Sequence, residues 1–191
     1  MAISLRAAAG LAADLTETEL VRMRDGSRVA LRAVSAQDEP ALRSFLAGLS
    51  ARARRLRFFS GAVDVTSAAH VTCATDGGRF GLLAHDETGV LVAHALYIPL
   101  DRTRAEVAVE VADHLHDRGL GTILIERLAA VAERRGITHF VAEVLPENGA
   151  MLDVFRDGFD AHVAFHEGTD EVELPTSAWR MASERFPAPH A

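Results

Sequence analysis

The fold of this chain is decided by one stretch, Glu106-Val-Ala-Val-Glu-Val-Ala-Asp-His-Leu-His-Asp-Arg-Gly-Leu-Gly-Thr122, which continues into Ile123-Leu-Ile-Glu-Arg-Leu128. In its first part, valines alternate with Glu106, an alanine and Glu110, which predicts a strand with one apolar and one more polar face. In its second part, apolar residues recur at helical spacing. The stretch therefore predicts a strand, a short turn that contains two glycines, and a helix.

The turn in this stretch, Arg118-Gly-Leu-Gly-Thr122, puts backbone amides at the start of the helix with little side-chain bulk around them. The first N–H groups of a helix lack internal partners and lie at the positive end of the helix dipole, so the turn is suited to bind phosphate. Taken alone, the two glycines are equally well explained as a structural turn. A dinucleotide-binding turn is the weaker interpretation, because it requires Gly-x-Gly-x-x-Gly directly after the first strand of a βαβ unit.

Composition narrows the classes of function. The chain has 191 residues, enough for one domain with a full core, and a formal net charge of −7. This charge argues against nucleic-acid binding, which needs a basic patch, and is compatible with basic acceptors such as lysine amines or polyamines.

The expected location follows from cysteine use and hydropathy. The single cysteine, Cys73, allows no internal disulfide and indicates a reducing compartment. No window approaches the roughly 18 apolar residues of a membrane helix, and the first residues lack the basic region of a signal peptide. We therefore expect a cytoplasmic protein, monomeric or homodimeric, that does not contact the membrane.

The rest of the chain alternates short strand and helix patterns. Strand patterns cover residues 21–32, which form a hairpin around an Asp-Gly turn, and residues 79–84, 90–97, 139–145, 162–166 and 171–174. Helical patterns cover residues 35–49, 50–60, 66–75 and 150–157, and the long helix ends near residue 135. This order predicts an α+β fold with a mixed central β-sheet flanked by helices on both faces. We expect an N-terminal arm at residues 1–19, the domain at 20–175 and a C-terminal tail at 176–191.

A second motif is Val144-Leu-Pro-Glu-Asn148-Gly-Ala-Met, which runs on through Phe155 to Gly158-Phe159. This motif, together with the glycine turn, resembles motifs B and A of the GNAT superfamily of acetyl-CoA-dependent acyltransferases. The family pattern at the turn is Gln/Arg-x-x-Gly-x-Gly/Ala; both glycines match, and His116 stands at the first position. The resemblance covers residues 20–175.

Three segments narrow the resemblance to one branch. The segments Leu-Arg-Phe-Phe-Ser60, Ala-Glu106-Val-Ala-Val and Leu-Pro-Glu-Asn148-Gly-Ala-Met are similar to the acetyltransferase domain of bacterial protein-lysine acetyltransferases that modify acyl-CoA synthetases. This resemblance implies an N-acetyltransferase that moves an acetyl group directly from acetyl-CoA to a protein lysine. No metal is implied, and the histidines lack the spacing of a metal site.

The resemblance also implies where the cofactor binds. The pantetheine arm is expected between strands 105–112 and 139–145. The residues expected to contact the cofactor are Val109 and Val111 along the first strand, Asn148 at the second motif, and His116, Asp117, Arg118, Gly119, Leu120, Gly121 and Thr122 at the turn. Asn148 is equally suited to cap the helix that it begins, and both roles can hold together.

Glu106 is the predicted general base. A lysine amine has a pKa of about 10.4 and must lose a proton before it attacks, and Glu106 matches the proposed base of the lysine-acetylating branch. Glu110 lies on the same strand face and is expected to be a solvated residue that is only a reserve for this role. The family's general acid is a Tyr, and Phe155 stands at that position. His94 is expected to be a core histidine with its hydrogen bonds satisfied.

Alternatives remain for the acceptor and for the basic stretch Ser50–Ser60. That stretch predicts a short helix with a solvated cationic face, and the alternative is a role in acceptor binding. The chain could instead acetylate a small-molecule amine. It could also be a catalytically silent acyl-CoA-binding module, which the missing Tyr favours.

Overall fold

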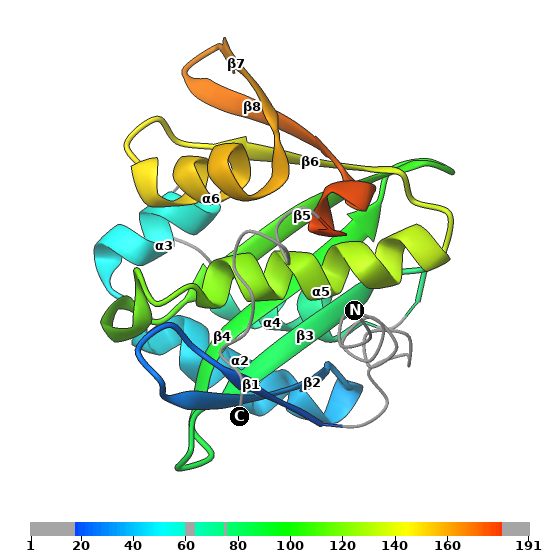
Figure 1. Cartoon of the computed structure of the whole chain (residues 1–191). Helices are drawn as coiled ribbons and strands as arrows, with labels where there is room; N and C mark the ends of the chain where they lie inside the picture. Colours follow the sequence, from blue (N-terminus) through cyan, green and yellow to red (C-terminus); the bar gives the residue numbers. More distant parts are fainter. Residues whose placement is uncertain (1–17, 60–63, 75, 181–191) are drawn as a thin grey trace, which may run out of the picture.

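The computed structural model describes residues 18–59, 64–74 and 76–180 of the chain (Figure 1). Its centre is a sheet in the order β1-β2-β3-β4-β5-β6-β8-β7. Only β5 and β6 pair in parallel; the other neighbouring strands pair antiparallel. The strands are β1 (Glu19–Arg22), β2 (Arg28–Ala33), β3 (Phe80–His85), β4 (Leu91–Pro99), β5 (Arg104–Val111), β6 (His139–Val144), β7 (His162–His166) and β8 (Thr169–Pro175). The mixed sheet predicted from the sequence is confirmed.

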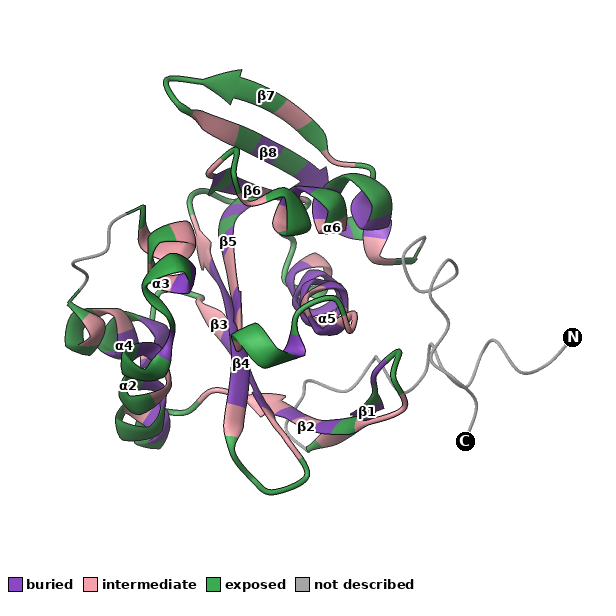
Figure 2. Cartoon of the chain, turned by 90° about the vertical axis from the view of Figure 1, so that its left-hand side faces the viewer, coloured by how far each residue is buried: buried purple, intermediate pink, exposed green. Residues whose placement is uncertain are grey.

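Helices cover both faces of the sheet, as predicted. On one face lie α2 (Glu39–Gly48), α3 (Ala51–Phe58) and α4 (Val65–Cys73); on the other lie α5 (Leu120–Arg134) and α6 (Gly149–Phe159) (Figure 2). Short 3₁₀ turns are η1 (Ala36–Asp38), η2 (Asp113–Leu115) and η3 (Thr176–Ala178). No helix in the described ranges is long and apolar enough to cross a membrane.

The two helical layers produce two hydrophobic cores. Successive strand residues point to opposite faces of a sheet, so Leu82 packs in the core under α5 while Leu83 packs in the core under α2 and α4. Both leucines are fully buried. Burial on both faces explains why β3 and β4 are nearly continuous apolar runs, whereas β5, which borders a cavity, carries glutamates.

The sheet opens between β5 and β6. Their register pairs end at Glu106, although β5 continues to Val111. On the other edge of β5, Ala112 N–H donates to the Val92 carbonyl at 2.8 Å. Hydrogen-bonding direction alternates along a strand, so the backbone groups of Val109 and Val111 point toward β6 and into the gap.

Both chain ends differ in detail from the predicted boundaries. β1 begins at Glu19, inside the segment expected to be an arm, and residues 1–17 lie outside the described ranges. In the predicted tail, Thr176 and Ala178 are buried, and Trp179 Nε1 donates to Glu133 of α5 at 2.9 Å. The first part of that tail therefore packs on the domain, while residues 181–191 are not described.

Candidate active site

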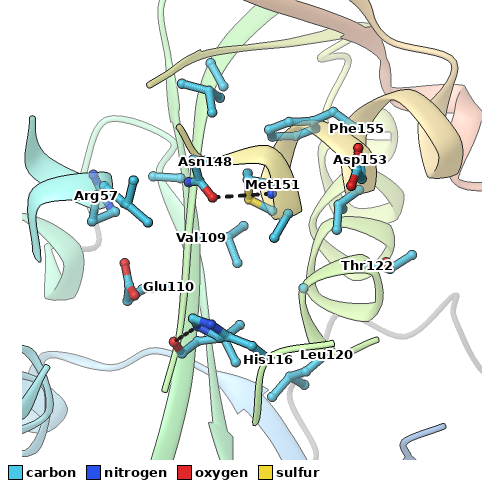
Figure 3. Close-up of a pocket in the computed structure, with 18 of the residues that line it drawn as sticks. Arg57, Val109, Glu110, His116, Leu120, Thr122, Asn148, Met151, Asp153 and Phe155 are labelled. Carbon is cyan, nitrogen blue, oxygen red and sulfur yellow. Dashed lines mark hydrogen bonds between the residues drawn. The ribbon is translucent and has the colours of Figure 1, made fainter. Parts of the chain in front are cut away.

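The opening between β5 and β6 leads into a cavity of about 560 Å³ bounded by β5, β6, α3, α6 and the turn before α5 (Figure 3). Every predicted site residue except Arg118 lines it. Those residues are Glu106, Val109, Val111, His116, Asp117, Gly119, Leu120, Gly121, Thr122 and Asn148. Residues predicted from two separate motifs therefore meet around one space.

The turn before α5 presents free amides to this cavity. Gly119 is the N-cap of α5 with φ +84°, and its carbonyl accepts the first helical hydrogen bond, from Ile123 at 3.1 Å. The amides of the next three residues therefore have no partner inside the helix. Gly121 follows in the first turn, where an added Cβ would meet only Met151 Cε at 3.8 Å.

The β1–β2 hairpin holds this turn from the side. Arg24 N–H donates to the Arg118 carbonyl at 3.2 Å, and Arg118 Nη1 donates to Asp25 Oδ2 at 2.7 Å. The Arg118 side chain thus faces the hairpin and does not line the cavity. Arg24 does line it, beside Gly119. The sequence analysis missed Arg24, because the hairpin is far from the turn along the chain.

His116 and Asn148 both make hydrogen bonds within the protein. The distance between His116 Nε2 and the Val111 carbonyl oxygen is 2.9 Å. With that carbonyl engaged, Val111 offers its N–H to a ligand in the gap. The Asn148 side chain accepts from Met151 N–H at 3.4 Å and caps α6, while it also lines the cavity (Figure 3). Both interpretations of Asn148 are therefore compatible with the geometry.

The two strand glutamates have different environments. Glu106 is exposed, whereas Glu110 is only 8% exposed, so the expectation that Glu110 is solvated is wrong. Their Cα atoms are about 13 Å apart, because four residues separate them along β5 at roughly 3.3 Å each. Burial raises the pKa of Glu110 to about 8; the charge of Arg57 opposes this rise, and Asp113 adds to it.

Two further side chains beside Glu110 depart from the sequence expectation. His94 lies opposite Glu110 on β4 and is 1% exposed, but neither ring nitrogen has a hydrogen-bond partner among the described residues. Burial, and secondarily the charge of Arg57, lowers the pKa of His94 to about 3. Arg57 on α3 has a buried Nε for which residues 18–59, 64–74 and 76–180 supply no hydrogen-bond partner, so the cationic face of α3 is not fully solvated. The side chain of Arg55, by contrast, is 61% exposed and pairs with Glu147.

Comparison with known proteins assigns the family. Residues 51–159, more than half of the chain, match the Acetyltransferase (GNAT) family. The GNAT domain of S. lividans PAT is 32% identical, with a TM-score of 0.74 over 83% of this chain and 96% of that one. This chain belongs to the GNAT acetyltransferase family.

Other GNAT-like structures share the fold at lower identity. A cAMP-binding acyltransferase from Mycobacterium smegmatis is 22% identical, with a TM-score of 0.61 over 92% of this chain and 54% of that one. A putative acetyltransferase from Salmonella typhimurium, solved with its cofactor acetyl-CoA, is 20% identical, with a TM-score of 0.61 over 78% of this chain and 94% of that one. The GNAT family uses acetyl-CoA, and the gap between β5 and β6 opens onto the turn before α5.

This GNAT domain has no tyrosine in its cavity. Its single tyrosine, Tyr97, is fully buried and its hydroxyl accepts a hydrogen bond from Arg135 at 3.3 Å; it does not line the cavity. Phe155, at the position expected for Tyr, is buried and does line the cavity. Protonation of the leaving thiolate therefore falls to another group or to water.

Proposed function

We propose that this protein is an acetyl-CoA-dependent N-acetyltransferase that acetylates lysine side chains of a protein. The observation that carries the proposal is the gap between β5 and β6, which begins after Glu106 and continues as one cavity to the amides before α5. The 32% identity to the GNAT domain of PAT supports a protein acceptor. The segments around Glu106 and Asn148 also resemble those of protein-lysine acetyltransferases, which supports a protein lysine as the acceptor.

The binding role of each residue follows from its position along the cavity. The amides of Leu120, Gly121 and Thr122 would hold the cofactor phosphates at the positive end of α5. The backbone of Val109 and the N–H of Val111 would pair with the pantetheine arm. The acetyl end would then lie toward Glu106, where β5 and β6 come together. A strand N–H at that point could stabilise the oxyanion that forms on the thioester carbonyl.

Glu106 is the proposed general base. It is exposed at the narrow end of the gap, where an acceptor lysine can reach it. It would take the proton of the attacking amine, directly or through one water. The new bond joins the amine nitrogen to the carbonyl carbon, the carbon–sulfur bond breaks, and the thiolate takes up a proton.

The experiment that tests this function is a thiol-release assay with acetyl-CoA. The acceptors are a panel of small amines and lysine peptides, together with acyl-CoA synthetases from the same cell, which are scanned for acetylated lysine by mass spectrometry. Turnover on lysine-containing proteins or peptides is expected. Turnover only on free amines would assign a small-molecule acceptor. Acetyl-CoA binding without turnover on any acceptor would identify a silent binding module.

A further inference from the structure

Arg57 is the basic residue of α3 that borders the cavity. It lines the cavity together with Glu106 and Glu110 of β5, and Figure 3 shows it on the same side of the strand as Glu110. Burial lowers the pKa of Arg57, and the negative charges of Glu110 and, more weakly, of Glu106 oppose that effect. Arg57 therefore lies beside the stretch of β5 between Glu110 and Glu106. In the proposed acyl-CoA site, on which this inference rests, the acyl end of the thioester would lie along that stretch toward Glu106.

The Arg57 guanidinium has no acidic partner in direct contact. Its Nε is buried without a hydrogen bond, and within the described ranges no carboxylate oxygen lies within 4.0 Å of any of its nitrogens. The guanidinium also lies over the Phe58 ring, with its Cζ 4.8 Å from the ring centroid. The side chain is half-buried, with its Nε on the buried side. Guanidinium groups stay charged in proteins, and removing part of an unpaired charge from water is costly. This arrangement favours an anionic ligand.

The nearest buried acid does not supply that anion at neutral pH. Burial raises the pKa of Glu110 to about 8, so its carboxyl is mostly protonated at pH 7. His94, which faces Glu110 from β4, is neutral for the same reason: burial disfavours its charged form and lowers its pKa to about 3. Glu106 is exposed to solvent, where its charge is screened. The part of the cavity next to Arg57 and Glu110 is thus positive at neutral pH.

We infer that the Arg57 guanidinium binds a carboxylate at the far end of the acyl group, so that this site accepts dicarboxylic acyl donors such as malonyl-CoA and succinyl-CoA. A planar guanidinium matches a carboxylate with two parallel hydrogen bonds, and such charge-assisted bonds are the strong ones. A neutral acyl chain of similar length would displace water from Arg57 without replacing the hydrogen bonds that the water made. The side chain therefore discriminates between acyl groups by their charge.

Two other occupants of the space are outcomes of the test. A water molecule could bridge Arg57 and Glu110, in which case the charge of the acyl group would not matter. A carboxylate of the acceptor could bind instead, in which case Arg57 would change the apparent affinity for the acceptor and leave thioester binding unchanged. Each of these results contradicts the inference.

The experiment compares succinyl-CoA with butyryl-CoA, which has a chain of similar length and no carboxylate. Calorimetric titration of the full chain at pH 7 is expected to give tighter binding of succinyl-CoA. Arg57→Met should weaken succinyl-CoA binding by about 10–100-fold, the range for one charge-assisted pair, and change butyryl-CoA binding by less than about threefold. Arg57→Lys keeps the positive charge but loses the planar guanidinium that can form two parallel hydrogen bonds. Its affinity for succinyl-CoA should lie between those of the wild type and Arg57→Met.

Arg55→Met is the matched control. It removes a cation from the same helix, but Arg55 pairs with Glu147 at 3.0 Å outside the cavity. It should leave the preference for succinyl-CoA unchanged. Equal or weaker binding of succinyl-CoA by the wild-type protein overturns the inference without any variant. If no acyl-CoA binds at all, the proposed function fails together with it.

A second measurement follows the preference for succinyl-CoA over butyryl-CoA as a function of pH. Ionised Glu110 competes with the ligand carboxylate for Arg57, so the preference for succinyl-CoA should decline as pH rises through about 8. The charged groups around Glu110 are Arg57, Asp113 and Glu106, with neutral His94 on β4. Glu110→Gln should abolish this decline. A preference that is independent of pH in both proteins contradicts the assigned partner of Arg57.

Discussion

Arg24 lies across Gly119: a Cβ built on Gly119 would come within 3.1 Å of Arg24 Nε. Gly119 also has φ +84°, a conformation that side chains with a Cβ disfavour. We expect Gly119→Ala to lower the free energy of unfolding by about 1–3 kcal/mol, from the left-handed backbone and the displaced arginine. Urea unfolding measures this loss, and Gly121→Ala should show none.

Arg24 should contribute to cofactor affinity. Its side chain adds a positive charge beside the amides that would hold phosphate. Arg24→Ala is expected to weaken CoA binding by about tenfold, which corresponds to roughly 1.4 kcal/mol. The control is Arg28→Ala in the same hairpin, because Arg28 pairs with Glu87 away from the cavity. Equal affinities of the two variants would exclude this role for Arg24.

Gly121 tests the position of the phosphate site. Acetyl-CoA should raise the melting temperature of the wild-type protein, since a ligand selective for the folded state stabilises it. Gly121→Glu should abolish this rise, because the carboxylate enters the site and repels phosphate. Gly121→Ala adds little bulk there and should retain it. A folded Gly121→Glu protein that binds acetyl-CoA normally would show that the phosphates bind elsewhere.

Glu106→Gln tests the proposed base. The change keeps the shape of the side chain and removes its basicity, so acetyl-CoA binding should persist while turnover falls by about 10²–10⁴-fold. The remaining activity should rise with pH, because the amine then loses its proton to solvent. Glu110→Gln should cost much less. Wild-type turnover in Glu106→Gln at pH 7, or a larger loss in Glu110→Gln, would contradict the assignment.

Glu110 should make the fold less stable as pH rises. Its pKa increases from 4.5 in the unfolded chain to about 8 in the folded protein, so the folded state binds more protons between these values. Its stabilising effect is therefore complete below pH 4.5 and is lost as pH rises through about 8. The free energy of unfolding of Glu110→Gln, taken relative to that of the wild type, should increase by about 2–4 kcal/mol between pH 4.5 and pH 9. Urea unfolding at a series of pH values measures this difference, and parallel curves would contradict it.

Much of the fold, including the glycine turn before α5, was predictable because the signals are local. The alternation in β5, the glycines before α5 and the apolar repeat within α5 are properties of neighbouring residues. The same is true of Asn148, where a helix start and a cavity residue coincide. Short-range periodicity reports which face of an element is apolar, and this places Glu106 and Glu110 on one face.

Periodicity cannot report what covers that face. The pattern of β5 treats Glu106 and Glu110 alike, and only the packing of α3 buries one and leaves the other exposed. The unpartnered Arg57 and His94 follow from the same packing, since desolvation depends on every neighbour in space.

The contact between the β1–β2 hairpin and the turn before α5 also depends on the tertiary structure. Asp25 and Arg118 are 93 positions apart along the chain, yet they form an ion pair beside the turn before α5. The sequence by itself determined the elements, their order and the cofactor motif, because those depend on neighbouring residues. Only the tertiary structure decided which charges are buried and which distant side chains reach the cavity, because burial and electrostatic interactions depend on distances in space.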